Sequence, residues 1–213
     1  AREIRVKGRE GTSFILILEG EETEVRLPLL GKHFVHNALS AIAAASLFGV
    51  EPERTIEALE QSRPFPMRME VFSLGNGKTV INDAYNANPN SMELALQTLS
   101  EAKGRGRAIA VLGDMLELGE LTVEAHHQLG KKVAELSIDL LLAIGDEAPV
   151  VVESAIREGL GHERARVVES HSEAASILRE LAREGDWILV KGSRGMAMEK
   201  VVEGLKERRE ERN

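Results

Sequence analysis

From about residue 65 onward the sequence alternates between short apolar runs and longer amphipathic segments, and this rhythm is its strongest constraint on the fold. The apolar runs predict strands, and the segments between them have the length and apolar spacing of helices. The predicted strands are MRMEVFSL and KTVIND, which form a hairpin around GNG, and residues 107–112, 138–144, 166–169 and 186–190. The predicted helices are residues 89–102, 121–136, 149–158, 172–184 and a last helix from about Met196. Strands that alternate with helices form right-handed βαβ units, so we expect an α/β fold with a doubly wound, mainly parallel sheet and helices on both faces.

The first 62 residues follow a different pattern. TSFILIL and TEVRLPLL flank EGEE and predict a β-hairpin. A helix is expected from about residue 34 to 48, and PERTIEALEQ predicts a second one whose proline suits a first helical turn. SRPFP holds two prolines that cannot continue a helix, so we expect a domain boundary near Arg63–Pro66. The expected domains are residues 1–63 and 64–213. The first of these domains resembles the C-terminal part of a larger domain.

The charge balance disfavours several classes of function. The chain has 27 Lys+Arg against 35 Asp+Glu, a formal net charge of -8, whereas nucleic-acid-binding proteins normally show a basic surface. It contains no cysteine, which excludes disulfides and thiolate chemistry. Its apolar runs are too short to span a bilayer and no signal-peptide pattern is visible, so we expect a cytoplasmic protein without membrane insertion. The last seven residues, ERREERN, mix both charges and predict a fraying helix end.

Polar side chains gather where three predicted strands end, in INDAYNANPNS, VLGDMLELGE and LVKGSRGM. Ligands of open parallel sheets bind beyond the carboxyl ends of the strands, so these segments are the candidate site. Asp83 lies just past a strand, where a carboxylate suits a ribose diol. Asn88 precedes Pro89 and fits a helix N-cap, and capping alone is an alternative explanation for the asparagines. Capping does not explain Asp83, Tyr85 and Asn86, which precede it.

The other two segments leave two interpretations open. In KGSRG, Lys191, Ser193 and Arg194 follow an apolar strand and either form a surface turn or an anion site with the backbone amides of a helix start. In VLGDMLELGE, Asp114 is either a turn residue in a solvated acidic loop or part of the site.

Several weaker motifs fail in their context. GNGKT lacks the first glycine of a P-loop and precedes a strand, and GRGR precedes a strand instead of following one. His126 and His127 are adjacent on a helix, point about 100° apart and lack a third ligand, so we expect them to be solvated. His33 and His36 lie around a helix start, and we expect them to cap the helix or contact a nucleotide and not to bind zinc.

The segments DAYNANPNSM, VLGDMLELGE and VKGSRGMAMEKVVEGL, in this order and spacing, strongly resemble the C-terminal domain of the Mur ligase family. GKHFVHNALSAIAA resembles the adenine-contacting helix of the family's central domain, so the resemblance covers nearly the whole chain except residues 1–27. It implies a Rossmann-like C-terminal domain and ATP-dependent amide formation through an acyl phosphate. The motifs point to the member that joins D-alanyl-D-alanine to the UDP-MurNAc-tripeptide. The P-loop and the Mg²⁺ ligands would lie upstream of Ala1, so the resemblance implies a fragment that is inactive alone. We also expect a monomer.

The resemblance also assigns roles to residues. It implies that ATP is bound by His33 and Asn37 near adenine, by Arg68 and by Asp83 at the ribose. It implies that the substrates are bound by Tyr85, Asn86, Asn88, Asp114, Lys191, Ser193 and Arg194. Ser193 is the best candidate for the carboxylate of the dipeptide. The chain departs from the family pattern at Phe34, where an asparagine is frequent, and at Gly195 and Ala197, where many relatives carry Ser and Arg.

Two other readings compete with this one. A related amide ligase, such as another Mur enzyme or a folylpolyglutamate synthase, would share the fold, but YNANP and GDMLELG favour the first assignment. A non-catalytic α/β binding module is the alternative from a different functional class. A P-loop upstream of Ala1 would separate the ligases from the binding module.

Overall fold

The computed structural model describes residues 1–75 and 77–206, which divide into two compact units, Ala1–Phe65 and Pro66–Asn213. Each unit has its own sheet and its own hydrophobic core. Asn76 in the predicted GNG turn and the predicted fraying end at residues 207–213 lie outside the described residues.

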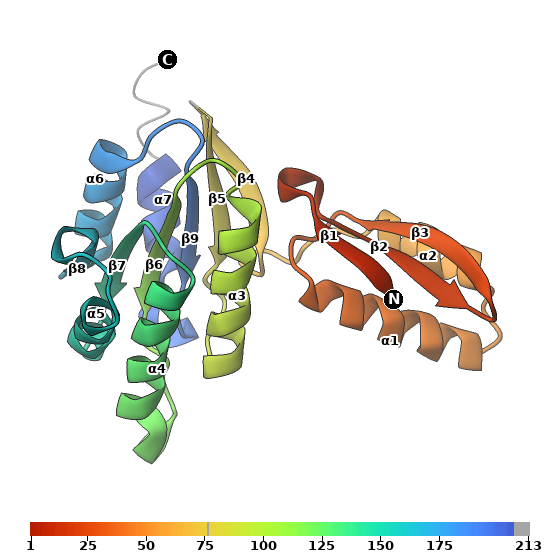
Figure 1. Cartoon of the computed structure of the whole chain (residues 1–213), viewed down its shortest axis with the longest axis horizontal. Helices are drawn as coiled ribbons and strands as arrows, with labels where there is room; N and C mark the ends of the chain where they lie inside the picture. The colour runs from red at the N-terminus through yellow and green to blue at the C-terminus, as the bar shows by residue number, and fades with distance from the viewer. Residues whose placement is uncertain (76, 207–213) are drawn as a thin grey trace. The chain divides into compact units, whose positions relative to one another are not determined.

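The first unit is a three-stranded antiparallel sheet in the order β1-β2-β3, with two helices packed on it (Figure 1). Its elements are β1 (Arg2–Val6), β2 (Thr12–Leu18), β3 (Glu21–Leu27), α1 (His33–Leu47) and α2 (Pro52–Glu60). In β3, Val25 and Leu27 are buried while Arg26 between them is exposed, so one face of the sheet is apolar. Helix α1 covers this face with Val35, Ala38 and Ile42. The predicted hairpin and both predicted helices are confirmed.

The second unit is the expected α/β domain. Its strands are β4 (Glu70–Gly75), β5 (Lys78–Asp83), β6 (Ala108–Gly113), β7 (Leu140–Ile144), β8 (Ala165–Val167) and β9 (Trp187–Lys191). Its α-helices are α3 (Pro89–Ala102), α4 (Thr122–Glu135), α5 (Ala148–Arg157), α6 (His171–Leu181) and α7 (Glu199–Lys206). The sheet order is β4-β5-β9-β6-β7-β8, in which only the β4–β5 pair is antiparallel. The doubly wound, mainly parallel sheet is therefore confirmed.

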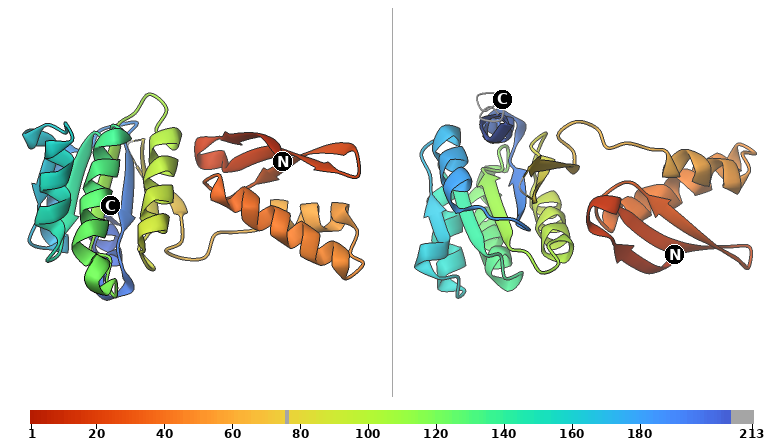
Figure 2. Two further views of the ribbon diagram at one scale, coloured as in Figure 1. Left: turned by 60° about the horizontal axis from the view of Figure 1, so that its bottom comes forward. Right: turned by 90° about the horizontal axis from the view of Figure 1, so that it is seen from above.

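The helices form two layers around this sheet. Helices α3, α4 and α5 pack side by side on one face, and α6 and α7 pack together on the other (Figure 2). The middle strands are buried on both faces, as the all-apolar β6 and β7 show. This arrangement leaves the ends of the strands as the places where polar side chains can gather.

The predicted start of the last helix at Met196 is wrong. Residues Arg194–Met196 form a 3-10 turn, and Ala197 adopts a left-handed backbone with φ of 48°, so α7 begins only at Glu199. The extra turn lengthens the loop that follows β9. That loop belongs to the candidate site.

Candidate functional site

The sheet has its topological switch at β9. This strand lies between β5 and β6, but the chain leaves it toward α7 on one face, whereas β5 and β6 lead to α3 and α4 on the other. The loops therefore diverge on both sides of β9 at the carboxyl ends of the strands, where open α/β sheets bind ligands. We call this region, formed by residues 67–70, 83–91, 113–119 and 191–199, the carboxyl edge.

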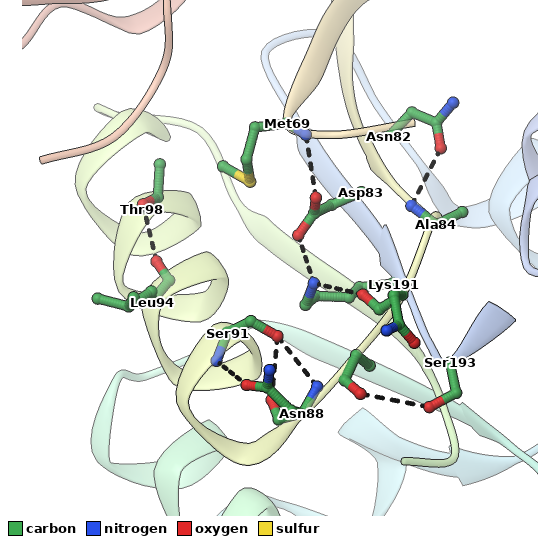
Figure 3. A network of polar contacts seen from close by, with 12 residues as sticks. Met69, Asn82, Asp83, Ala84, Asn88, Ser91, Leu94, Thr98, Lys191 and Ser193 are labelled. Carbon is green, nitrogen blue, oxygen red and sulfur yellow. Dashed lines mark hydrogen bonds and ion pairs between the residues drawn. The ribbon is translucent and has the colours of Figure 1, made fainter. Parts of the chain in front are cut away.

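A buried ion pair joins the ends of β5 and β9. Asp83 and Lys191 are partners in the strand register, and Lys191 Nζ lies 2.5 Å from Asp83 Oδ2 (Figure 3). The same ammonium group donates to the carbonyl oxygen of Asn86 at 2.9 Å, and Asp83 Oδ1 accepts the Met69 N–H at 3.0 Å. The Lys191 side chain is 3% exposed and that of Asp83 is 13% exposed. Removing one partner of such a pair leaves a buried charge uncompensated, at a cost of about 3–5 kcal/mol.

Ser193 connects three of the four segments of the carboxyl edge, those that follow β5, β6 and β9. Its N–H donates to the Asp114 carbonyl at 3.0 Å, and its buried hydroxyl oxygen accepts the Leu116 N–H at 2.8 Å. The hydroxyl also donates to the Ala87 carbonyl at 3.4 Å, a long contact. The loops after β5, β6 and β9 thus meet at one side chain.

Two glycines allow β6 and β9 to approach each other at this point. A Cβ atom on Gly192 would lie 3.0 Å from the Cα of Gly113 and 2.7 Å from Met198 Cγ. A Cβ on Gly113 would lie 2.7 Å from Met198 Sδ. Met198 is fully buried beneath both strand ends, so neither position has space for a larger residue.

The side chain of Asp114 turns into the loop between β7 and α5. Asp114 Oδ2 accepts the Asp146 N–H at 2.8 Å, and Oδ1 accepts the Glu147 N–H at 3.3 Å. Burial raises the pKa of Asp114, against the opposing effect of these amide hydrogen bonds. Gly145, with φ of 126°, leaves room for the carboxylate, since a Cβ there would lie 2.2 Å from Oδ2. The carboxylate therefore stabilises the start of α5, and its substrate-binding role stays a prediction.

His126 is not solvated, so that prediction is wrong. The residue is fully buried, its Nε2 accepts the Met115 N–H at 3.0 Å, and its Nδ1–H donates to the Thr122 carbonyl at 2.7 Å. This tautomer follows from the two partners, because an N–H can only donate and a carbonyl can only accept. His126 thereby holds the loop after β6 in place. Among the described residues, no group of three metal-binding side chains is present.

Two arginines stand on the exposed part of the carboxyl edge. The guanidinium of Arg68 lies 4.1 Å from the ring centre of Tyr85, a cation–π contact between two exposed side chains that is worth about 0.5–1 kcal/mol. The Arg194 side chain is 55% exposed and pairs with Glu199 at 3.0 Å. Both cations therefore remain accessible to an anion in solution.

The asparagines divide into two kinds. Asn88 caps α3 in a reciprocal capping box, since its Oδ1 accepts the Ser91 N–H at 2.8 Å and its own N–H donates to Ser91 Oγ at 3.1 Å (Figure 3). The N-cap prediction is confirmed for this residue. The side chain of Asn86 is exposed, and its main-chain carbonyl oxygen accepts a hydrogen bond from Lys191.

The remaining predicted residues lie in the first unit. His33 and Asn37 are four residues apart on α1 and therefore share one face of that helix. The His33 ring lies 4.3 Å from the ring of Phe34, which packs against the core of the unit. Asn37 is exposed.

Sequence reasoning did not single out Glu70, which the structure places at the carboxyl edge. Its Oε2 accepts the Met67 N–H at 3.2 Å and Asn82 Nδ2 at 3.1 Å. The only signal in the sequence was its place in a strand directly after MRM.

Among the described helices, none is long and apolar enough to cross a membrane.

Comparisons with known proteins identify the family of the chain. The family described as "Mur ligase, glutamate ligase domain" matches residues 67–194. The UDP-N-acetylmuramoyl-tripeptide--D-alanyl-D-alanine ligase of Bacillus subtilis is 38% identical over 202 residues, which cover 93% of this chain and 43% of that protein. The enzyme of the same name from Escherichia coli is 32% identical over 197 residues, 92% of this chain and 42% of that protein.

A solved structure gives the same picture. The crystal structure of MurF from Acinetobacter baumannii matches with a TM-score of 0.84 at 33% identity, over 97% of this chain and 44% of that chain. The chain therefore spans less than half the length of the relatives that it matches. The family match over residues 67–194 includes β4 to β9 and the loops of the carboxyl edge up to Arg194. The chain belongs to the Mur ligase family.

Proposed function

We propose that this chain is part of a longer cytoplasmic, monomeric ATP-dependent ligase that adds D-alanyl-D-alanine to the UDP-MurNAc-tripeptide. The observation that carries the proposal is the carboxyl edge, where three family motifs are joined through Asp83–Lys191 and Ser193 and leave two arginines exposed. The names of the relatives from Bacillus subtilis and Escherichia coli support the choice of substrates.

The proposed reaction forms an amide through an acyl phosphate. The terminal carboxylate of the tripeptide attacks the γ-phosphate of ATP and ADP leaves. The amine of D-alanyl-D-alanine then attacks the acyl carbon, a tetrahedral intermediate forms, and phosphate leaves. This chemistry depends mainly on positioning and on stabilisation of negative charge. The residues of this chain would therefore bind and orient, while the phosphates of ATP and Mg²⁺ would be held mainly by a part of the ligase outside it.

Within the chain we propose two binding roles. Arg68 and Asp83 in the second unit, and His33 and Asn37 in the first, bind the nucleotide. The side chains after β5, β6 and β9 bind the substrates, with Ser193 as the best candidate for the carboxylate of the dipeptide and Arg194 as an additional exposed cation. The substrate-binding set comprises Tyr85, Asn86, Asn88, Asp114, Lys191, Ser193 and Arg194. Because Lys191, Asp114 and Asn88 already use their polar atoms on internal partners, they would act by shaping the loops.

Phosphate release by the complete ligase tests the proposal. We expect release that requires ATP, the UDP-MurNAc-tripeptide and D-alanyl-D-alanine together. Equal or faster release with a single amino acid, such as L-alanine or glutamate, in place of the dipeptide would instead assign the chain to another amide ligase of the family. Absence of release with every amine would favour the non-catalytic binding module.

A further inference from the structure

The backbone around Arg68 is unusual. Met67 and Met69, on either side of it, both have a positive φ, of 59° and 49°. Residues other than glycine seldom adopt this left-handed conformation. Such backbones persist only where the surroundings hold them, and they cluster at functional sites. Two of them around one exposed arginine therefore need a structural cause.

Three hydrogen bonds hold this segment in place. Glu70 Oε2 accepts the Met67 N–H at 3.2 Å, and Asp83 Oδ1 accepts the Met69 N–H at 3.0 Å. The Met67 carbonyl accepts the Tyr85 N–H at 3.1 Å. The turn that carries Arg68 is therefore fixed to the end of β5 and to the loop that follows it.

The two carboxylates differ in what else they bind. Asp83 also pairs with Lys191, so it has a second structural role. Glu70 bonds Met67 and Asn82 Nδ2, and among the described residues it pairs with no lysine or arginine. These two hydrogen bonds of Glu70 therefore both connect the turn to β5. This makes Glu70 the specific support of the Arg68 turn.

Arg68 itself is free to meet an anion. Its guanidinium lies over Tyr85, and within the described part of the chain it pairs with no carboxylate. We propose that Glu70 is a positioning residue that fixes the left-handed turn and thereby holds Arg68 on Tyr85, ready for the phosphate groups of the nucleotide. The identity of the anion rests on the proposed function, whereas the positioning of Arg68 does not.

The first experiment uses the 213-residue chain alone. In the wild type, the Tyr85 ring current should shift the Arg68 Cδ proton resonances upfield. Glu70→Ala should remove this shift, and Glu70→Gln should retain most of it, because the remaining oxygen can accept both hydrogen bonds. Glu180→Ala, at an exposed position on α6, is the matched control and should leave the shift unchanged. Fluorescence of Trp187, the only tryptophan, verifies that each variant is folded. An unchanged Arg68 shift in folded Glu70→Ala would overturn the proposal.

The second experiment measures the complete ligase. Glu70→Ala should lower kcat/KM for ATP about tenfold, the size expected for weakened hydrogen bonds to a charged ligand. In an Arg68→Ala background the same substitution should have no further effect, because both changes remove one function. A full effect in that background would overturn the proposal. A wild-type ligase without activity would instead overturn the proposed function, and the resonance experiment would still decide the role of Glu70.

Discussion

At the scale of single residues, the Asp83–Lys191 pair changes how a substitution at Asp83 has to be interpreted. A carboxylate at a strand end is a natural ribose ligand, but here both oxygens already have partners in Met69 and Lys191. A lower affinity for ATP after its removal would therefore combine a lost contact with a damaged site. Stability and nucleotide binding must be measured on the same variants.

We expect Asp83→Ala to lower the free energy of unfolding of the second unit by about 3–5 kcal/mol, because Lys191 would remain buried without its counter-charge. Urea unfolding followed by Trp187 fluorescence reports on this unit alone, since Trp187 begins β9. The double variant Asp83→Ala/Lys191→Met should recover most of the loss. If the double variant is as unstable as the single one, the two side chains are not an energetic pair.

Ser193 gives a second prediction at this scale. In the complete ligase, Ser193→Ala should raise the KM for D-alanyl-D-alanine about tenfold and leave the KM for ATP nearly unchanged, since it removes a hydroxyl beside Arg194 and frees the Leu116 N–H. Ser154→Ala is the control, because Ser154 is equally buried but donates to the His127 carbonyl away from the carboxyl edge. Equal changes in the two KM values would assign Ser193 a purely structural role.

At the scale of elements, Asp114 and Gly145 form a joint between β6 and α5. Gly145→Ala should destabilise the second unit by more than the roughly 1–3 kcal/mol expected from a strained backbone alone, because the new Cβ would displace the Asp114 carboxylate. Gly159→Ala is the matched control, since Gly159 has φ of 107° and nothing lies within 4 Å of its Cβ position. Equal losses of unfolding free energy for the two variants would contradict the joint.

The opposite end of the sheet has its own joint at Asp139. Its Oδ2 accepts Lys103 Nζ and the Ala108 N–H, both at 2.8 Å, and Arg164 lies nearby. Burial raises the pKa of Asp139, but Lys103, the Ala108 amide and Arg164 together bring it below its ordinary value of 3.8. A carboxyl group with a lowered folded pKa binds fewer protons in the folded state than in the unfolded state. Its stabilising contribution is therefore complete above pH 3.8 and is lost as the pH falls through the folded value.

We accordingly expect Asp139→Asn to destabilise the second unit at neutral pH and to differ less and less from the wild type as the pH falls below 3.8. Unfolding free energies measured across this range decide the point. A constant difference for Asp139→Asn would show that the loss comes from packing and not from the charge.

The sequence predicted the elements well because apolar spacing decides them, as β6 and α3 illustrate. It could not place the start of α7, because alanine gives no signal in the sequence that its backbone will be left-handed at position 197. The prediction for His126 was wrong because a histidine on an amphipathic helix gives no sign in the sequence that both ring nitrogens will find backbone partners. These two hydrogen bonds allow the ring to be buried. It placed Asp83 and Lys191 at strand ends, but their pairing follows from a strand order that the pattern of elements does not determine.

At the scale of the whole molecule, the chain spans less than half the length of the relatives that it matches. We expect the 213-residue chain alone to show neither ATPase nor ligase activity, because no P-loop pattern occurs in it to bind the β- and γ-phosphates. Phosphate release by the purified chain, compared with a no-protein blank, tests this. Release above the blank would mean that ATP binds through residues other than those proposed.

The position of β9 also affects how the second unit can be synthesised. Among the described strands, β9 comes last in sequence but lies in the middle of its sheet, so β5 and β6 have no common neighbour until residues 187–191 are available. During translation, the β4–β5 hairpin and the strands β6, β7 and β8 therefore cannot pair into one sheet until the ribosome has synthesised β9. Contacts over such long sequence separations slow folding, and unpaired strand edges invite aggregation in the meantime. The arrangement that brings Asp83 and Lys191 together thus makes folding of the nascent second unit dependent on residues 187–191.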